Sequence, residues 1–314
     1  MTQVLFTFLL PAYKTKFFAE ALQSIKRQTY SHFRCIVSDD CSPEDIKEIY
    51  DNEVGLDSRF TYRRNDENMG KNSIVSHWNL LVDMCDTNYF IMASDDDVYE
   101  PHFLEEIDKL IKKYPSCKLF RGRPKYINEN NDILISDPLW EEFLDSLCFV
   151  RMALSNITIS CEPNFCYTTK YFRHKGGYVD FPAAWFSDDA THILMAEYGC
   201  ACTQNVVFGF RASNINISSQ QTNRRICADK VLAAISFWVW STINIAKYRK
   251  DKEFHPFYWA IRECKQRAID QYEKNIIHCS FKDFLILSHK ASHTLGLSKI
   301  VYFYYWLRFR LKGV

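Results

Sequence analysis

Residues 4–13 have the sequence VLFTFLLPAY, a continuous apolar run that Pro11 stops. Such a run is typical of a buried strand in a parallel sheet. Apolar residues then recur at helical spacing from Phe17 to Gln28, and Phe33–Val37 indicates a second short strand. Together these segments predict one β-α-β unit, with a loop that begins at Pro11.

The same alternation of helix and strand continues to about residue 115. The further predicted elements are a helix from Pro43 to about Tyr50 capped by Ser42, strands at 60–63 and 89–93, a helix from about Ser73 to Cys85, and a helix after Pro101. This pattern predicts an α/β doubly wound sheet, in which ligands bind beyond the carboxyl ends of the strands. Past residue 115 the pattern weakens. Short strands are predicted near 118–120 and 206–210, an irregular stretch of mixed helix and loop at 126–160, and a helix after Asp189 that ends at Gly199.

Acidic residues follow the ends of several predicted strands. The cluster Asp95-Asp96-Asp97 would be stabilised by Mg²⁺ or Mn²⁺, which bridges carboxylates to a diphosphate. The alternative is capping of the helix after Pro101. Asp39-Asp40 could accept hydrogen bonds from a nucleobase or ribose, or form a turn ahead of the Ser42 cap. Further along, Asp188-Asp189 could supply a general base or cap a helix.

Three other segments have a functional and an ordinary interpretation. Asn68, Gly70 and Lys71 could approach a phosphate, or form a plain loop between strand and helix. Arg211 and Ser213, with the run 216–219, could form a lid over a diphosphate, or a surface loop. Trp185 could stack on a sugar face or pack in the core.

Composition indicates a folded protein: 314 residues, 47% apolar and 25% charged. The net charge of +1 hides an asymmetry, because residues 247–314 hold 14 Lys and Arg against 6 Asp and Glu. The twelve cysteines form no CxxC pair, so we expect reduced thiols and a cytoplasmic protein. The longest uncharged run, Val231–Ala246, has 16 residues, which is shorter than the roughly 20 that span a bilayer.

In order along the chain stand Pro11-Ala12-Tyr13, Gln28-Thr29, Asp39-Asp40-Cys41-Ser42, Asn68-Met69-Gly70, Asp95-Asp96-Asp97, Gly176-Gly177-Tyr178 and Asp188-Asp189. This series resembles the family 2 inverting glycosyltransferases of the GT-A fold. The resemblance covers about residues 1–220 and implies a catalytic domain there, with a nucleotide-sugar-binding half at 1–115 and an acceptor-side half at 116–220. Residues 221–314 would be a C-terminal helical region, with helices near 223–248, 253–274, 281–293 and 296–311.

The resemblance also implies roles for single residues. The expected nucleotide-sugar-binding residues are Pro11, Ala12, Tyr13, Asp39, Asp40, Asn68, Gly70, Lys71, Asp95, Arg211 and Ser213. Asp96 and Asp97 would hold the metal, with Ser94 in place of the first acid of the family's DxD motif. Asp189 would be the catalytic base and Asp188 its possible partner. Gly176, Gly177 and Trp185 would contact the acceptor or the sugar.

The function so implied is metal-dependent, inverting transfer of a sugar from a nucleoside diphosphate, with a UDP-sugar as the first expectation. The acceptor would be a glycan or a lipid-linked glycan in surface polysaccharide synthesis. A nucleotidyltransferase and an inert nucleotide-sugar-binding scaffold are the alternatives.

The basic and aromatic segment 299–312 would suit an interfacial helix on an anionic membrane, at its inner face, or else a helix packed on its own domain or a partner. No nucleic-acid partner is expected, since the basic excess is modest.

Overall fold

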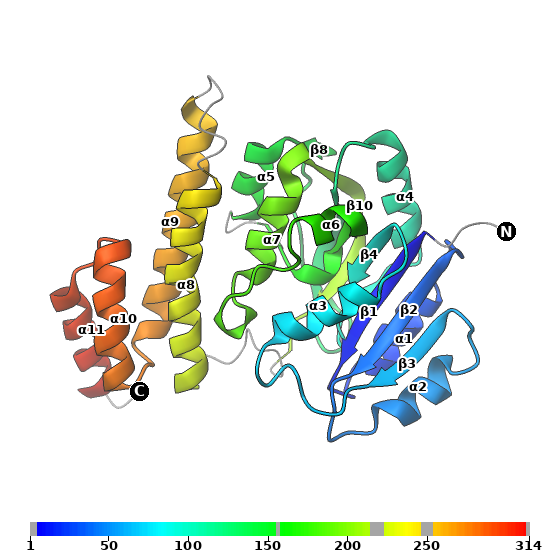
Figure 1. The fold of residues 1–314 in the computed structure, drawn as a ribbon, viewed down its shortest axis with the longest axis horizontal. Helices are drawn as coiled ribbons and strands as arrows, with labels where there is room; N and C mark the ends of the chain where they lie inside the picture. Colours follow the sequence, from blue (N-terminus) through cyan, green and yellow to red (C-terminus); the bar gives the residue numbers. More distant parts are fainter. Residues whose placement is uncertain (1–4, 155–157, 214–222, 246–253, 312–314) are drawn as a thin grey trace. The chain divides into compact units, whose positions relative to one another are not determined.

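The computed structural model describes residues 5–154, 158–213, 223–245 and 254–311 (Figure 1). The chain forms two compact units. Unit 1 consists of residues 1–179 and 191–212, and unit 2 of residues 180–190 and 213–314.

Unit 1 is built on a sheet of ten strands that mixes parallel and antiparallel pairs. The strands are β1 (Phe6–Ala12), β2 (Phe33–Asp39), β3 (Phe60–Arg64), β4 (Tyr89–Met92), β5 (Val98–Tyr99), β6 (Leu119–Ile127), β7 (Ile133–Ser136), β8 (Phe143–Leu144), β9 (Phe165–Thr168) and β10 (Cys200–Arg211). Their order is β3-β2-β1-β4-β9-β6-β10-β5, with β7 beside β6 and β8 beside β10. The α/β fold class with a mixed sheet is thereby confirmed.

The first four strands are all parallel, as the alternation predicts. Ala12 at the end of β1 pairs with Asp39, and Asp39 pairs with Arg64 at the end of β3. The polar residues that follow these strands therefore start from the same edge of the sheet. Beyond β4 the pattern changes, because β9 enters antiparallel between β4 and β6.

The helices of unit 1 are α1 (Phe18–Lys26), α2 (Ile46–Val54), α3 (Ile74–Met84), α4 (Phe103–Lys113), α5 (Ser146–Ala153) and α6 (Thr169–His174). On β1, Phe6, Phe8 and Leu10 belong to one buried apolar cluster, which also contains the inner faces of α1, α2 and α4. Side chains alternate along a strand, so Thr7 and Leu9 face the opposite side of the sheet. Both faces of β1 are therefore buried, which explains the continuous apolar run in its sequence.

The start of α2 differs from the prediction. Asp45, not Ser42, is its N-cap, and the Asp45 carboxylate accepts a hydrogen bond from the Glu48 N–H at 3.0 Å. The Ser42 hydroxyl accepts the Glu44 N–H at 3.0 Å, ahead of the helix, and donates to the carbonyl oxygen of Tyr13 at 2.6 Å. It thus joins the loops that follow β1 and β2.

The segment 126–160, predicted as irregular, contains the end of β6 together with β7, β8 and α5. Helix α7 (Ser187–Met195) begins in unit 2 and continues into unit 1. Short 3₁₀ turns lie at Glu162–Asn164, Pro182–Ala184 and Ala196–Tyr198.

Within the described residues, unit 2 contains a short segment, residues 180–190, and the four helices that follow Asn223. The helices are α8 (Arg224–Asn244), α9 (Phe254–Ile276), α10 (Phe281–Thr294) and α11 (Lys299–Leu311), close to the predicted ranges. The short segment was predicted to belong to the catalytic domain. It packs with the helices because Phe186 stacks on Phe237 of α8 at 4.4 Å between ring centroids. The predicted boundary at residues 220 and 221 lies outside the described residues.

Helix α8 has 21 residues and is long and apolar enough to cross a membrane by length and composition alone. The predicted uncharged run begins after Lys230, whereas helix α8 includes Lys230. The Lys230 ammonium lies over the Trp185 ring at 4.2 Å, so its charge is accommodated within unit 2. Of the most apolar window of α8, 44% is buried inside the protein, and the core helix of a soluble protein passes the same test of length and composition.

Candidate active site

The loop after β1 is tied to the acid cluster that follows β4. One Asp95 carboxylate oxygen accepts hydrogen bonds from the backbone N–H groups of Tyr13 and Lys14, both at 2.8 Å. These bonds fix the backbone of the loop and occupy the carboxylate that was predicted to lie at the ribose. Burial raises the pKa of Asp95, against the opposing charge of Lys14.

Lys14 brings a positive charge into this cluster. Its ammonium lies 2.7 Å from Asp96 Oδ2 and 3.3 Å from Asp95 Oδ1. Burial alone would lower the pKa of Lys14, but the charges of Asp95 and Asp96 outweigh that effect and raise it. Among the described residues, Lys14 is the only side chain that pairs with the Asp96 carboxylate.

Asp97 has a different environment from its neighbour Asp96. Its two carboxylate oxygens accept hydrogen bonds from the Ser94 hydroxyl at 2.5 Å and the Arg211 N–H at 2.7 Å. Burial, and then the charge of Asp96, raise the pKa of Asp97 to about 8. Protein donors engage both Asp97 oxygens, whereas among the described residues Asp96 has one flexible side-chain partner, so these contacts favour Asp96 over Asp97 as a metal ligand.

Arg211 donates hydrogen bonds to the acid cluster Asp95–Asp97. It is fully buried, its Nε donates to the Asp96 carbonyl oxygen at 2.8 Å, and its Nη2 pairs with Glu20 at 2.8 Å. The guanidinium also lies 4.3 Å from the centre of the Phe17 ring. With these partners Arg211 holds the loop after β4 in place. Ser213 is buried, and the predicted lid segment 216–219 lies outside the described residues.

The capping alternative for Asp95–Asp97 does not match the structure. Helix α4 begins only at Phe103, and its N-cap is His102, which makes no capping hydrogen bond. The acids are instead collected around Lys14 and the backbone of Arg211.

Asp39, at the end of β2, is fully enclosed by protein partners. Its carboxylate accepts the Ser42 N–H at 2.8 Å and the Tyr62 hydroxyl at 2.7 Å, and it forms a short ion pair with Arg64. Burial and the contact with Asp39 raise the pKa of Tyr62 to about 12. The turn before Ser42 is formed, as one interpretation of Asp39 predicts. The binding of a nucleobase or ribose by Asp39 stays a prediction.

Asp40 holds the loop that follows β3. Its oxygens accept hydrogen bonds from the Asn65 side chain at 2.7 Å and from the Met69 and Gly70 N–H groups at 2.9 and 2.8 Å. A Cβ on Gly70 would lie 2.9 Å from Asp40 Oδ2, so a larger residue would push the loop away. The structure thereby unites two predicted motifs, Asp39-Asp40 and Asn68-Met69-Gly70.

The remaining predicted donor-site residues lie on the same edge of unit 1. Pro11 and Ala12 end β1, and Tyr13 extends beyond it with 41% of its side chain exposed. Lys71 is exposed, and its N–H is bonded to the Asn68 side chain at 2.7 Å. Tyr13 and Lys71 are therefore accessible to a ligand at this edge.

Gly176 and Gly177 form a tight turn after α6, with φ angles of +94° and +84°. A Cβ on Gly177 would meet the Asn79 side chain at 2.6 Å, so this turn requires glycine for close approach. The turn brings Tyr178 to Glu162, a buried carboxyl group that also accepts the Tyr167 hydroxyl. The contact of Gly176 and Gly177 with the acceptor or the sugar stays a prediction.

Trp185, Asp188 and Asp189 belong to unit 2. Asp189 is nearly buried, and its N–H donates to the Asp188 carboxylate at 2.9 Å at the start of α7. Ala183, Ala184 and Phe186 precede these acids with φ between +55° and +67°. Such backbone is costly for residues other than glycine, and it is concentrated at functional sites.

Solved structures of similar fold cover most of this chain. The match to residues 1–349 of S. aureus TarS with UDP-GlcNAc has a TM-score of 0.65 at 15% identity, and covers 92% of this chain and 81% of that one. The match to the mannosyltransferase PcManGT from Pyrobaculum calidifontis, solved with GDP-Man and Mn²⁺, has a TM-score of 0.55 at 15% identity, and covers 99% and 87%.

The sequence model of glycosyl transferase family 2 matches residues 7–174, more than half of the chain. The chain belongs to glycosyl transferase family 2. Its mixed sheet is the GT-A fold, and the resemblance seen in the sequence is confirmed. The enzyme is therefore a glycosyltransferase, and the nucleotidyltransferase and scaffold alternatives receive no support.

The acid cluster of this glycosyltransferase suits a divalent cation that the substrate helps to hold. No group of three or more His, Cys, Asp or Glu side chains within the described residues could hold a metal by itself. Mg²⁺ is commonly bound through one or two carboxylates with substrate phosphates supplying further ligands. Asp96, with hard oxygen atoms and a displaceable partner, fits that arrangement.

Some residues of this enzyme escaped the sequence analysis. Lys14 directly follows the Pro11-Ala12-Tyr13 motif, and a cation beside a predicted nucleotide-binding motif was the available signal. Glu162 and His192 form a fully buried contact at 3.2 Å, and burial raises the pKa of Glu162 to about 8. Nothing in the local sequence around Glu162 indicates that contact.

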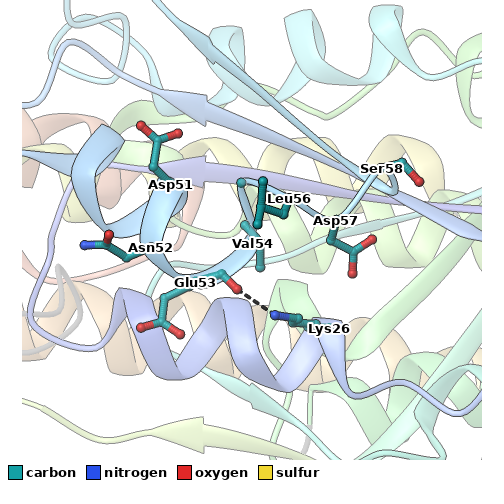
Figure 2. Close-up of a pocket in the computed structure, with 9 residues that line it drawn as sticks. Lys26, Asp51, Asn52, Glu53, Val54, Leu56, Asp57 and Ser58 are labelled. Atoms are coloured by element: carbon teal, nitrogen blue, oxygen red, sulfur yellow. Dashed lines mark hydrogen bonds between the residues drawn. The ribbon is translucent and has the colours of Figure 1, made fainter.

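A hollow of about 480 Å³ lies elsewhere in the glycosyltransferase (Figure 2). It is lined by Lys26 and residues 51–58, and the Lys26 ammonium donates to the Glu53 carbonyl oxygen at 2.8 Å across it. These residues precede β2 and β3, so the hollow lies at the amino ends of the parallel strands. Ligands of such sheets bind at the opposite edge, where the acid cluster lies.

Proposed function

We propose that this glycosyltransferase is metal-dependent and inverting, and that it transfers a sugar from a nucleoside diphosphate, with a UDP-sugar as the first candidate. The observation that carries the proposal is the environment of Asp96, a buried carboxylate whose one side-chain partner among the described residues is the displaceable ammonium of Lys14. The neighbours crystallised with UDP-GlcNAc and with GDP-Man and Mn²⁺ support a donor of this class.

In the proposed reaction Asp189 removes the proton from an acceptor hydroxyl. The acceptor oxygen forms a bond to the anomeric carbon as the bond from that carbon to the diphosphate oxygen breaks, and the nucleoside diphosphate leaves with the electron pair. A single displacement on the face opposite the leaving group inverts the anomeric configuration. A metal held at Asp96 would stabilise the charge on the departing diphosphate.

The start of α7 supports Asp189 as the base. The Asp188 carboxylate accepts the Asp189 N–H, so it orients the backbone of the residue that would do the chemistry. Ala183, Ala184 and Phe186 adopt left-handed backbone conformations in the turn before α7. An ordinary helix start does not require such conformations, and their energetic cost is typical of functional sites. Trp185, within the same turn, offers an aromatic face to a sugar, although Lys230 covers one side of the ring.

We further propose that the acceptor is a glycan or a lipid-linked glycan at the cytoplasmic face of a membrane, in surface polysaccharide synthesis. Unit 2 carries exposed apolar side chains beside basic ones: Phe281, Leu285, Ile286, Ile300, Tyr304, Leu307 and Leu311, with Lys282, Lys290 and Arg308. This combination matches an anionic lipid surface. Tyr302, Trp306 and Arg310, also predicted for the lipid face, pack within unit 2 instead, where Arg310 donates to the Cys279 carbonyl oxygen at 2.7 Å.

The function is tested by a thermal-shift screen of UDP, GDP, dTDP and CMP, each with and without Mn²⁺, followed by transfer assays with the sugar donor of the nucleotide that binds. A ligand that binds the folded state raises the melting temperature. We expect one diphosphate to do so in an Mn²⁺-dependent way. Asp189→Asn should keep that shift and lose transfer by a factor of about 1,000 or more, since it removes the base. Equal loss of donor binding in Asp189→Asn and Asp96→Ala would contradict the separate roles.

Membrane association is tested by sedimentation of the full chain with vesicles of phosphatidylglycerol and phosphatidylcholine, against vesicles of phosphatidylcholine alone. We expect binding to the anionic vesicles, and its loss in the double variant Ile300→Glu and Tyr304→Glu. Leu56→Glu is the matched control, because Leu56 is fully exposed in unit 1. Equal sedimentation of the double variant and the control would contradict the assignment of this surface.

A further inference from the structure

Lys14 has a position that an ordinary surface lysine does not have. Its ammonium contacts two carboxylates of the acid cluster, Asp96 at 2.7 Å and Asp95 at 3.3 Å. Lys16, two residues later, makes a single pair with Glu129 in which both side chains are more than 40% exposed. The Asp95 and Asp96 side chains are less than 10% exposed, so the charges that Lys14 meets are largely withdrawn from water.

The backbone holds Lys14 at this position. Its own N–H and that of Tyr13 donate to Asp95 Oδ2, and the Ser42 hydroxyl donates to the Tyr13 carbonyl oxygen. The side chain therefore starts from an anchored loop and ends on the carboxylate that is proposed to hold the metal. Only the stem and the ammonium of Lys14 need to move for the Asp96 oxygens to become available.

A lysine ammonium and a divalent cation at Asp96 would satisfy the same negative charge. A cation bound to Asp96 Oδ2 would share this oxygen with the Lys14 ammonium, and two cations on one oxygen repel each other strongly away from bulk water. We infer that Lys14 is a built-in competitor of the divalent cation: it neutralises Asp95 and Asp96 while no metal is bound, and it must be displaced before a metal can bind. This inference rests on the proposed metal dependence of the enzyme.

Two consequences separate this role from that of a structural ion pair. Without Lys14, the carboxylates of the metal-free protein lack a cation, so the protein should be less stable until a metal is added. The same removal should make metal binding tighter, because the metal no longer displaces a bound charge. A lysine that only maintains the loop would give the opposite result for the metal, since its removal would disorder the site.

The experiment measures Mn²⁺ binding to the full chain by isothermal titration calorimetry, with the amount of free Mn²⁺ followed by electron paramagnetic resonance. The variants are Lys14→Met, which keeps the apolar stem, Lys14→Arg, which keeps the charge, and Lys16→Met as the matched control. We expect Lys14→Met to bind Mn²⁺ at least tenfold more tightly than the natural protein. Lys14→Arg and Lys16→Met should stay within a factor of about three of it.

Melting temperatures give a readout that does not depend on activity. In EDTA, Lys14→Met should melt below the natural protein, and saturating Mn²⁺ should raise its melting temperature by more than it raises that of the natural protein. In a protein that also carries Asp96→Asn, Lys14→Met should no longer change the affinity for Mn²⁺. If Lys14→Met does not fold, Lys14→Gln replaces it, since glutamine keeps a polar end without the charge.

Equal or weaker Mn²⁺ binding by Lys14→Met, or by Lys14→Gln in its place, would overturn the inference. So would the absence of Mn²⁺ binding in both the natural protein and the variant. The donor screen distinguishes this failure from that of the proposed function: nucleotide shifts that persist in EDTA would remove the metal from the proposal and leave sugar transfer in place.

Discussion

Two pairs of adjacent aspartates lie at the ends of β2 and β4, the two parallel strands on either side of β1, and they have different environments. Asp39 and Asp40, after β2, accept hydrogen bonds from backbone N–H groups, Tyr62 and Asn65, and Asp39 is paired with Arg64. Asp95 and Asp96, after β4, share one lysine. The first pair is satisfied by the protein. In the second pair Asp95 also accepts two backbone N–H groups, whereas Asp96 has carboxylate charge to offer to a ligand.

The comparison shows how an acid that stabilises the fold differs from an acid that binds a ligand. In a folded protein, a buried carboxylate is retained either because fixed donors of the protein neutralise it or because a ligand does so. Half of the donors to Asp39 and Asp40 are backbone N–H groups, which cannot move without unfolding the loop. The donor to Asp96 is a flexible side chain. Substitutions in the two pairs should therefore affect different quantities.

Asp96→Ala should produce the largest effect of all, and on ligand binding alone. We expect Mn²⁺-dependent binding of the donor nucleotide to weaken at least about 100-fold, while the melting temperature in EDTA stays within a few degrees of that of the natural protein. Calorimetry with the nucleotide and Mn²⁺ measures this. Asp51→Asn, an exposed acid on α2, serves as the control. Unchanged nucleotide binding in Asp96→Ala would remove the distinction between the two pairs.

Asp40→Ala should affect stability instead. The substitution leaves the Asn65 side chain and the Met69 and Gly70 N–H groups without their acceptor. We expect the free energy of unfolding to fall by about 2–4 kcal/mol, as measured by urea denaturation. A loss no greater than that in Asp51→Asn would show that these bonds contribute little.

Asp97→Asn should change how stability depends on pH. Burial raises the pKa of Asp97 from the ordinary value near 4 to about 8 in the folded state. Between these values the folded state binds the proton more strongly than the unfolded state, so the contribution of Asp97 to stability decreases as the pH rises from about 4 to 8. Asn carries no such proton. We expect the melting temperature of the variant to fall less between pH 5 and pH 8.5, and parallel pH profiles would contradict this.

Arg64→Met should give the smallest change. The Arg64 side chain is 45% exposed, and Asp39 keeps the Ser42 N–H and the Tyr62 hydroxyl after its removal. Water screens the exposed Arg64 end of this pair, so we expect the free energy of unfolding to fall by less than in Asp40→Ala, as measured by urea denaturation. Lys47→Met, which breaks an exposed pair with Asp51, is the comparison. A loss as large as that of Asp40→Ala would mean that the ion pair, more than the hydrogen bonds, stabilises the first acid pair.

Much of unit 1 was predictable from its sequence. The first four strands, their alternation with α1 to α3 and the position of acids at strand ends follow from apolar patterns a few residues long. The helices of unit 2 were found at nearly the predicted ranges for the same reason. The antiparallel entry of β9 between β4 and β6 was not predicted, because strand order depends on contacts across the whole chain.

Strand ends and hydrophobic periodicity are local properties, so the positions where carboxylates gather could be predicted from the sequence. Which of these carboxylates the protein neutralises itself depends on contacts that form only in the folded chain. The partners are distant in sequence: Asp39 and Arg64 are 25 residues apart, Lys14 and Asp96 are 82 apart, and Asp97 and Arg211 are 114 apart. The charge and hydrogen bonds that a buried acid receives depend on distance in space, and that distance is defined only when the strands pack into one sheet.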